Sequence, residues 1–78
     1  MKTTGLGEKL RERLALLLEI EPSSIAADEL FGDLGVDSMM RLELVALVEQ
    51  HVGQEIPERD LPTMQTIGDV LQYVESSV

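Results

Sequence analysis

The sequence predicts an all-α fold, a small bundle of three main helices plus one short helix. Leucines recur at helical spacing in the first quarter of the chain, and apolar periodicity of the same kind returns in two later segments. The period-2 alternation that indicates strands is absent. With 78 residues and no cysteine, a single domain over residues 1–78 must be held together by apolar packing alone.

The first helix is expected from about residue 4 to residue 19. Thr3 or Thr4 is a suitable N-cap, and Pro22 stops the helix. The expected buried side consists of Leu6, Leu10, Leu14, Leu17 and Leu18.

Residues 21–36 combine prolines, serines and glycines with isolated apolar residues. This pattern predicts a long connection that is pinned to the core. Because structureless loops of this length are uncommon, we expect a short helical turn around residues 26–31.

The second helix should begin at Asp37-Ser38 and run to about His51, with Asp37 as N-cap and Gly53 as the stop. The expected core stripe is Met40, Leu44, Leu47, Val48 and Val52. Nearly opposite this stripe lies a second apolar strip, Met39, Leu42 and Ala46, bordered by Glu43, Glu49 and Gln50. An exposed apolar strip with a charged rim is typical of a docking surface. The alternative is that this side packs on the 21–36 connection.

After Ile56, two prolines restrict residues 57–62 to a turn or a very short helix. The last helix should start near Thr66 with Tyr73 half exposed. Its expected buried edge is Ile67, Val70, Leu71 and Val74.

Acidic residues are concentrated in the middle of the chain. The formal net charge is −9. Residues 1–27 are neutral overall, whereas residues 28–60 hold nine acids against Arg41 and Arg59, a net charge of −7. Such a surface repels nucleic acid and anionic lipid and attracts proteins with basic patches, although it can also serve solubility alone.

Neither a membrane span nor a secretory leader is indicated. No apolar run approaches the roughly 20 residues that a span needs, and charges at residues 8–13 interrupt any signal-peptide core. We therefore expect a cytoplasmic protein, and a monomer.

Catalytic and metal-binding apparatus is not recognisable. The chain has one histidine, His51, no cysteine and no glycine-rich phosphate loop. Most nucleophile and base pairs, zinc sites and P-loops are thereby excluded, so the sequence predicts neither an enzyme nor a metal site.

One segment stands out, residues 33–39, with the sequence DLGVDSM, which delivers Ser38 to the first turn of a helix. A phosphate esterified to Ser38 would meet the unpaired amides and positive dipole end of that helix. On spacing alone, Asp37-Ser38 is also explained by ordinary capping.

The segment 33–39 resembles the phosphopantetheine attachment motif of the acyl carrier protein family, Asp-Ser-Leu preceded by Leu-Gly. Met39 stands in place of the usual leucine, a near-isosteric change, and Arg41 is unusual on an otherwise acidic helix. Similar residues elsewhere extend the resemblance over nearly the whole chain: Phe31, Leu42-Glu43-Leu44, Glu55-Ile56-Pro57, Thr66-Ile67-Gly68-Asp69-Val70 and Tyr73.

The resemblance implies a carrier without catalytic activity. A phosphopantetheinyl transferase would attach 4'-phosphopantetheine from coenzyme A covalently to Ser38, and acyl groups would travel on the arm as thioesters. Acyl-loading and synthase enzymes of fatty acid or polyketide-type biosynthesis, with basic patches, would be the partners. The docking surface would consist of Asp37, Met39, Leu42, Glu43, Ala46 and Glu49. The acyl chain could be sheltered between the helices.

Three alternatives stay open at this point. A peptidyl or aminoacyl carrier commonly has a Gly-Gly-x-Ser approach to the serine, whereas this chain has Val36-Asp37-Ser38. An unmodified carrier-like interaction module differs only in chemical modification. An acidic nucleic-acid mimic would spread its acids along one face rather than group them around one serine.

Overall fold

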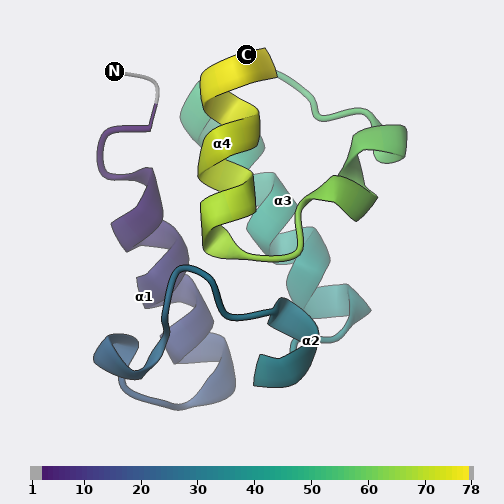
Figure 1. Cartoon of the computed structure of the whole chain (residues 1–78). Coiled ribbons are helices and arrows are strands. Elements are labelled where there is room, and N and C mark those ends of the chain that lie inside the picture. Colours follow the sequence, from purple (N-terminus) through teal and green to yellow (C-terminus); the bar gives the residue numbers. More distant parts are fainter. Residues whose placement is uncertain (1–2, 78) are drawn as a thin grey trace.

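The computed structural model describes residues 3–77, and over this range the chain forms helices but no strand. The main helices are α1 (Leu6–Leu18), α3 (Ser38–Val52) and α4 (Ile67–Ser77). A short helix, α2 (Phe31–Leu34), and two 3-10 turns, η1 (Pro22–Ser24) and η2 (Glu58–Thr63), lie in the connections (Figure 1). The predicted all-α bundle is confirmed.

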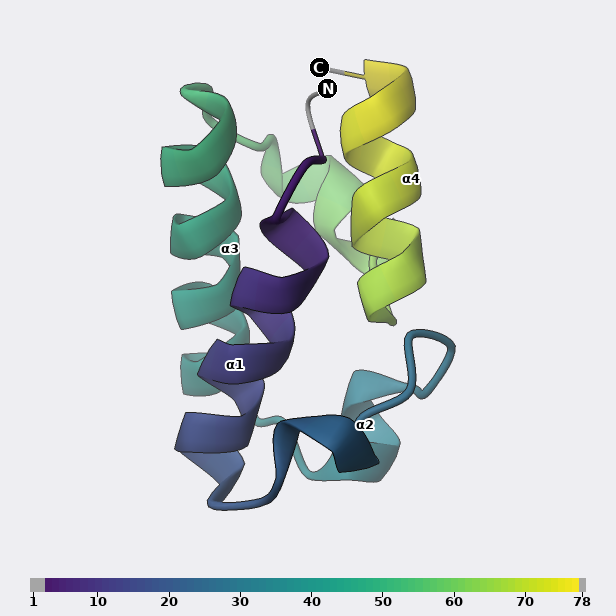
Figure 2. The same cartoon turned by 90° about the vertical axis from the view of Figure 1, so that its left-hand side faces the viewer.

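The core lies where the three main helices meet. Helix α1 packs against both α3 and α4 (Figure 2). Leu6, Leu10 and Leu14 are fully buried in α1, as are Ile67 and Val74 in α4. The predicted Leu17 and Leu18 are only half-buried, and Leu18 packs against the edge of the core. Aliphatic packing therefore supports most of the fold, with Phe31 as the one aromatic residue in the buried core of the described chain.

The N-terminus of α1 differs from the prediction. Neither Thr3 nor Thr4 is the N-cap; Gly5 occupies that position with φ 76°, and no side chain caps the helix. A left-handed conformation favours glycine and places the threonines outside the helix. The Thr3 hydroxyl instead donates to Glu75 Oε2 at 3.2 Å.

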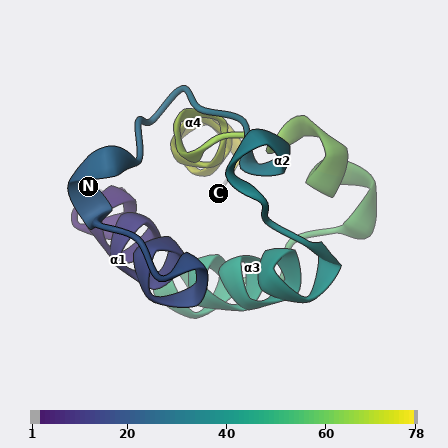
Figure 3. The same ribbon diagram turned by 90° about the horizontal axis from the view of Figure 1, so that it is seen from below.

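The short helix also lies later than predicted. It spans residues 31–34 rather than 26–31, and η1 forms earlier in the connection. Buried Phe31 fixes the position of α2, because its amide donates to the Gln65 carbonyl at 2.8 Å. Viewed from below, the connection passes around α4 before it reaches α2 (Figure 3). There the Gly68 amide donates to the Ala27 carbonyl at 2.9 Å.

The C-terminal third matches the prediction. The segment between the prolines forms only η2, and α4 buries Ile67, Val70 and Val74 while Tyr73 is half exposed. The predicted Leu71 is only half-buried, at the edge of the core. The Tyr73 hydroxyl donates to Asp60 Oδ2 at 2.6 Å, which ties η2 to α4.

We expect Tyr73→Phe to change how stability depends on pH. The hydrogen bond to Asp60, with desolvation and the Asp60 charge, raises the pKa of Tyr73 above its ordinary value of 10.0. The stability that neutral Tyr73 adds to the folded state is therefore fully present below about pH 10. It is lost as the pH rises through the raised pKa of the folded state. At pH 7 the free energy of unfolding of the variant should be about 0.5–1.5 kcal/mol lower than that of the wild type.

Urea unfolding at neutral and alkaline pH measures both effects. Because the chain has one tyrosine, an ultraviolet titration reports the pKa of Tyr73 directly. Equal pH dependence of the two proteins above pH 10 would contradict the assignment.

Candidate functional site

Ser38 is the first residue of α3 and is exposed. The turn before it is set by Gly35, whose φ of 94° ends α2 in the left-handed region that favours glycine. Val36 is then buried, and its amide donates to the Phe31 carbonyl at 3.0 Å. A buried anchor two residues away thus holds the serine at the surface.

Asp37 is the N-cap of α3, as predicted. Its Oδ1 accepts from the Met40 amide at 2.9 Å, and its carbonyl accepts from the Arg41 amide at 3.0 Å. The carboxylate therefore faces its own helix. The first turn still presents the positive end of the helix dipole beside Ser38, an environment that suits a phosphodiester.

The apolar strip near Ser38 is exposed, as helical periodicity predicted. Met39 is 75% exposed and Leu42 61%, and Ala46 is exposed as well. The alternative, in which this side packs on the 21–36 connection, is wrong because Met39 is among the most exposed apolar side chains of the described chain. Two large apolar side chains, Met39 and Leu42, are thus left in water close to Ser38.

The two predicted rim glutamates differ in their surroundings. Glu43 is exposed and lies 3.5 Å from Arg13 Nη1, so α1 partly neutralises it. Glu49 is half-buried, and its Oε2 accepts from the Ile56 amide at 2.8 Å. Glu49 thus holds the loop after α3, a role that the sequence did not reveal.

A small apolar cavity of about 70 Å³ lies between α3, η2 and α4. It is less than half of the roughly 150 Å³ that holds a benzene-sized ligand. Nine of its ten lining residues are apolar, and the tenth is Arg41. The lining residues are Phe31, Arg41, Leu42, Leu44, Val45, Val48, Ile56, Leu61, Met64 and Val70.

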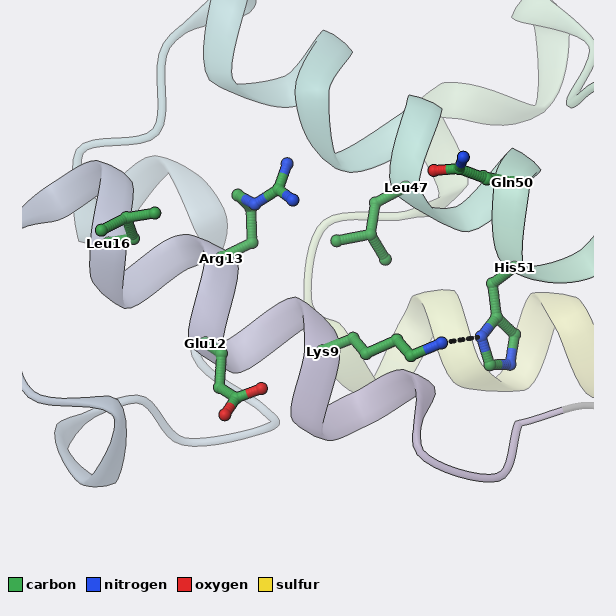
Figure 4. Close-up of a pocket in the computed structure, with 7 residues that line it drawn as sticks. All are labelled: Lys9, Glu12, Arg13, Leu16, Leu47, Gln50 and His51. Carbon is green, nitrogen blue, oxygen red and sulfur yellow. Dashed lines mark hydrogen bonds between the residues drawn. The ribbon is translucent and has the colours of Figure 1, made fainter.

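A larger and more open hollow of about 380 Å³ is lined by residues of α1 and α3 (Figure 4). Lys9 Nζ lies 3.2 Å from His51 Nδ1 across it. The hollow contains none of the residues predicted to carry the arm or to dock enzymes. Its lining residues are Lys9, Glu12, Arg13, Leu16, Leu47, Gln50 and His51.

Among residues 3–77, no group of three or more histidine, aspartate or glutamate side chains is arranged to hold a metal ion. In the same range, no helix is both long and apolar enough to cross a membrane.

Comparison with known proteins shows the family of the chain. A family model described as a phosphopantetheine attachment site matches residues 8–74. This chain belongs to the acyl carrier protein family. An acyl carrier protein of Treponema pallidum (strain Nichols) is 37% identical over 71 residues, 90% of this chain and 91% of the relative. An acyl carrier protein of Akkermansia muciniphila is 33% identical over 76 residues, 96% of this chain and 95% of the relative.

Acyl carrier proteins are carriers and not enzymes, and their cofactor is covalently attached 4'-phosphopantetheine. Membership therefore implies contact with a phosphopantetheinyl transferase and with synthase enzymes. The attachment domain accounts for most of the described bundle, from within α1 to within α4.

Proposed function

We propose that this acyl carrier protein bears 4'-phosphopantetheine on Ser38 Oγ. It delivers acyl groups as thioesters to cytoplasmic enzymes of fatty acid or polyketide-type biosynthesis, and it acts as a monomer. The main support is the exposed Ser38 at the start of α3, beside an exposed apolar strip. In addition, residues 8–74 of the chain match the attachment-site family.

The chain contributes position and environment to this function. Gly35 and Asp37 fix the turn and the helix start, so Ser38 Oγ is presented to solvent with a defined orientation. The helix dipole favours a phosphodiester at this point. When attached, the arm supplies the thiol on which acyl groups are carried.

We propose that Asp37, Met39, Leu42, Glu43, Ala46 and Glu49 form the docking surface. Met39, Leu42 and Ala46 provide the apolar contact, and the acidic residues attract basic patches. Exposed ion pairs contribute only about 0–1 kcal/mol each, so each complex is weak and sensitive to salt. Weak docking suits a carrier that must visit successive enzymes.

Glu43→Lys should slow loading by a phosphopantetheinyl transferase about two- to fivefold at low salt, because one exposed attractive pair is replaced by repulsion. The difference should shrink as salt screens the charges. The measurement is kcat/KM for the carrier over a salt series. Glu75→Lys makes the same charge change at an exposed position on α4 and should leave kcat/KM nearly unchanged. Equal effects of the two variants would contradict a local docking surface.

The cavity between α3, η2 and α4 is the proposed shelter for an acyl chain. Its lining is almost wholly apolar, so burying a chain there is favourable. At about 70 Å³ it must widen to accept one. Flexible methionine and leucine side chains in its lining, Met64 and Leu61, permit such widening.

The absence of cysteine makes a sharp test of the proposed function. We expect the chain to gain one phosphopantetheine mass increment on incubation with coenzyme A and a broad-specificity phosphopantetheinyl transferase. It should also gain one titratable thiol, and no other thiol exists in the sequence. A folded chain that gains neither would overturn the proposal.

A further inference from the structure

Arg41 makes contacts that join three parts of the fold. Its Nη2 donates to Gln65 Oε1 at 3.1 Å. Its guanidinium carbon lies 5.8 Å from the centre of the Phe31 ring, a cation–π distance. The side chain thereby links α3 to α2 and to the segment that precedes α4. Arg41 is half-buried.

Arg41 lies at the rim of the apolar cavity. Phe31, Leu44 and Val48 are buried and belong to its base, whereas Arg41, with exposed Leu42 and half-buried Leu61, belongs to its outer edge. Among the ten lining residues, Arg41 alone carries a charge. A guanidinium at the edge of an otherwise apolar cavity discriminates between groups that can accept hydrogen bonds and groups that cannot.

Arg41 lies on the same side of α3 as Ser38. Ser38, Arg41, Leu42 and Val45 stand at i, i+3, i+4 and i+7, so they share one side of the helix. Three of these four residues line the cavity. An acyl chain that enters from an arm on Ser38 therefore meets Arg41 near the thioester end of the chain.

Entry of a chain disturbs the contacts of Arg41. Displacing the guanidinium from Gln65 and Phe31 removes a hydrogen-bond acceptor and a cation–π partner. A saturated chain offers one replacement, the thioester carbonyl, whereas a chain with an oxygen at the 3-position offers a second acceptor that the planar guanidinium can reach together with the first. A donor left unpaired in an apolar setting is unfavourable. A carbonyl, hydroxyl or carboxylate oxygen near the thioester would accept from the guanidinium in place of Gln65.

We infer that Arg41 is a specificity-determining residue, and that it favours the sheltering of acyl cargo with an oxygen acceptor near the thioester over fully saturated cargo. This inference rests on the proposed carrier function. It assigns oxygenated chains, such as 3-oxoacyl groups, as the preferred cargo class of the cavity.

The test compares two cargoes of equal chain length on the full chain. A phosphopantetheinyl transferase loads octanoyl or 3-oxooctanoyl phosphopantetheine from the corresponding coenzyme A thioester, and intact mass confirms loading. The rise in Tm over the unacylated holo form reports sheltering, because cargo held by the folded state stabilises it. We expect 3-oxooctanoyl to raise the Tm of the wild type by several degrees more than octanoyl does.

Arg41→Met keeps a flexible, unbranched stem without the donors, and should reverse the order of the two cargoes. Arg41→Lys keeps the charge but loses the planar fork, and should retain a reduced preference for 3-oxooctanoyl. Arg59→Met removes the same charge from an exposed position on η2 outside the cavity lining, and should preserve the wild-type order.

The inference is overturned if the wild type shows no preference for 3-oxooctanoyl, or if Arg41→Met shows the same preference as the wild type. Either result with complete loading leaves the carrier function standing, since the mass measurement reports it independently. Failure to load at all would instead contradict the proposed function. The Tm of each unacylated holo variant shows whether that variant folds.

Discussion

Ser38→Ala is expected to abolish phosphopantetheine loading and to change the free energy of unfolding by less than about 0.5 kcal/mol. The hydroxyl is the only group that the substitution removes, and the side chain is exposed. Capping of α3 depends on Asp37 Oδ1 and not on Ser38. Intact mass after incubation with coenzyme A and the transferase measures loading, and urea unfolding measures stability.

Ser76→Ala is the matched control. Ser76 is an exposed serine within α4, far along the sequence from the attachment motif. The Ser76→Ala variant should be loaded with phosphopantetheine to the same extent as the wild type. If Ser38→Ala still gained the mass increment, or if Ser76→Ala lost it, the attachment site would lie elsewhere.

Leu14→Ala is expected to lower the free energy of unfolding by about 2–5 kcal/mol, because a fully buried leucine leaves a cavity when it is truncated. Domains of this kind have total stabilities near 5–15 kcal/mol, so the loss is a large share. Urea unfolding followed by circular dichroism measures the change.

The same helix supplies the control for this prediction. Leu16 lies two residues further along α1 and is 73% exposed, so Leu16→Ala should shift the free energy of unfolding by less than about 0.5 kcal/mol. Similar losses in the two variants would show that α1 does not pack in the observed register.

The main helices could be predicted because their signals are local. Leucine spacing defines α1, and Asp37 and Gly53 mark the two ends of α3. The N-cap of α1 could not be predicted because Gly5 takes a left-handed conformation, which the threonine-rich sequence around it does not indicate. The position of α2 depends on the backbone contact between Phe31 and Gln65, which are 34 residues apart.

The candidate site was predictable in its position and less so in its contacts. Exposure of Met39, Leu42 and Ala46 followed from helical periodicity. Glu49 binding to the Ile56 amide and Arg41 binding to Gln65 are tertiary contacts, which no periodicity encodes. Arg41 carried one usable signal, a positive charge three residues after Ser38 on an acidic helix.

The most direct measurement of the attachment site is fragmentation mass spectrometry of the wild-type chain after loading from coenzyme A. The chain has serines at 23, 24, 38, 76 and 77, so fragment masses can separate the candidates. We predict a single phosphopantetheine increment confined to fragments that contain Ser38. An increment on any other residue, or a folded chain that stays unmodified, would contradict the assignment of Ser38 as the carrier serine.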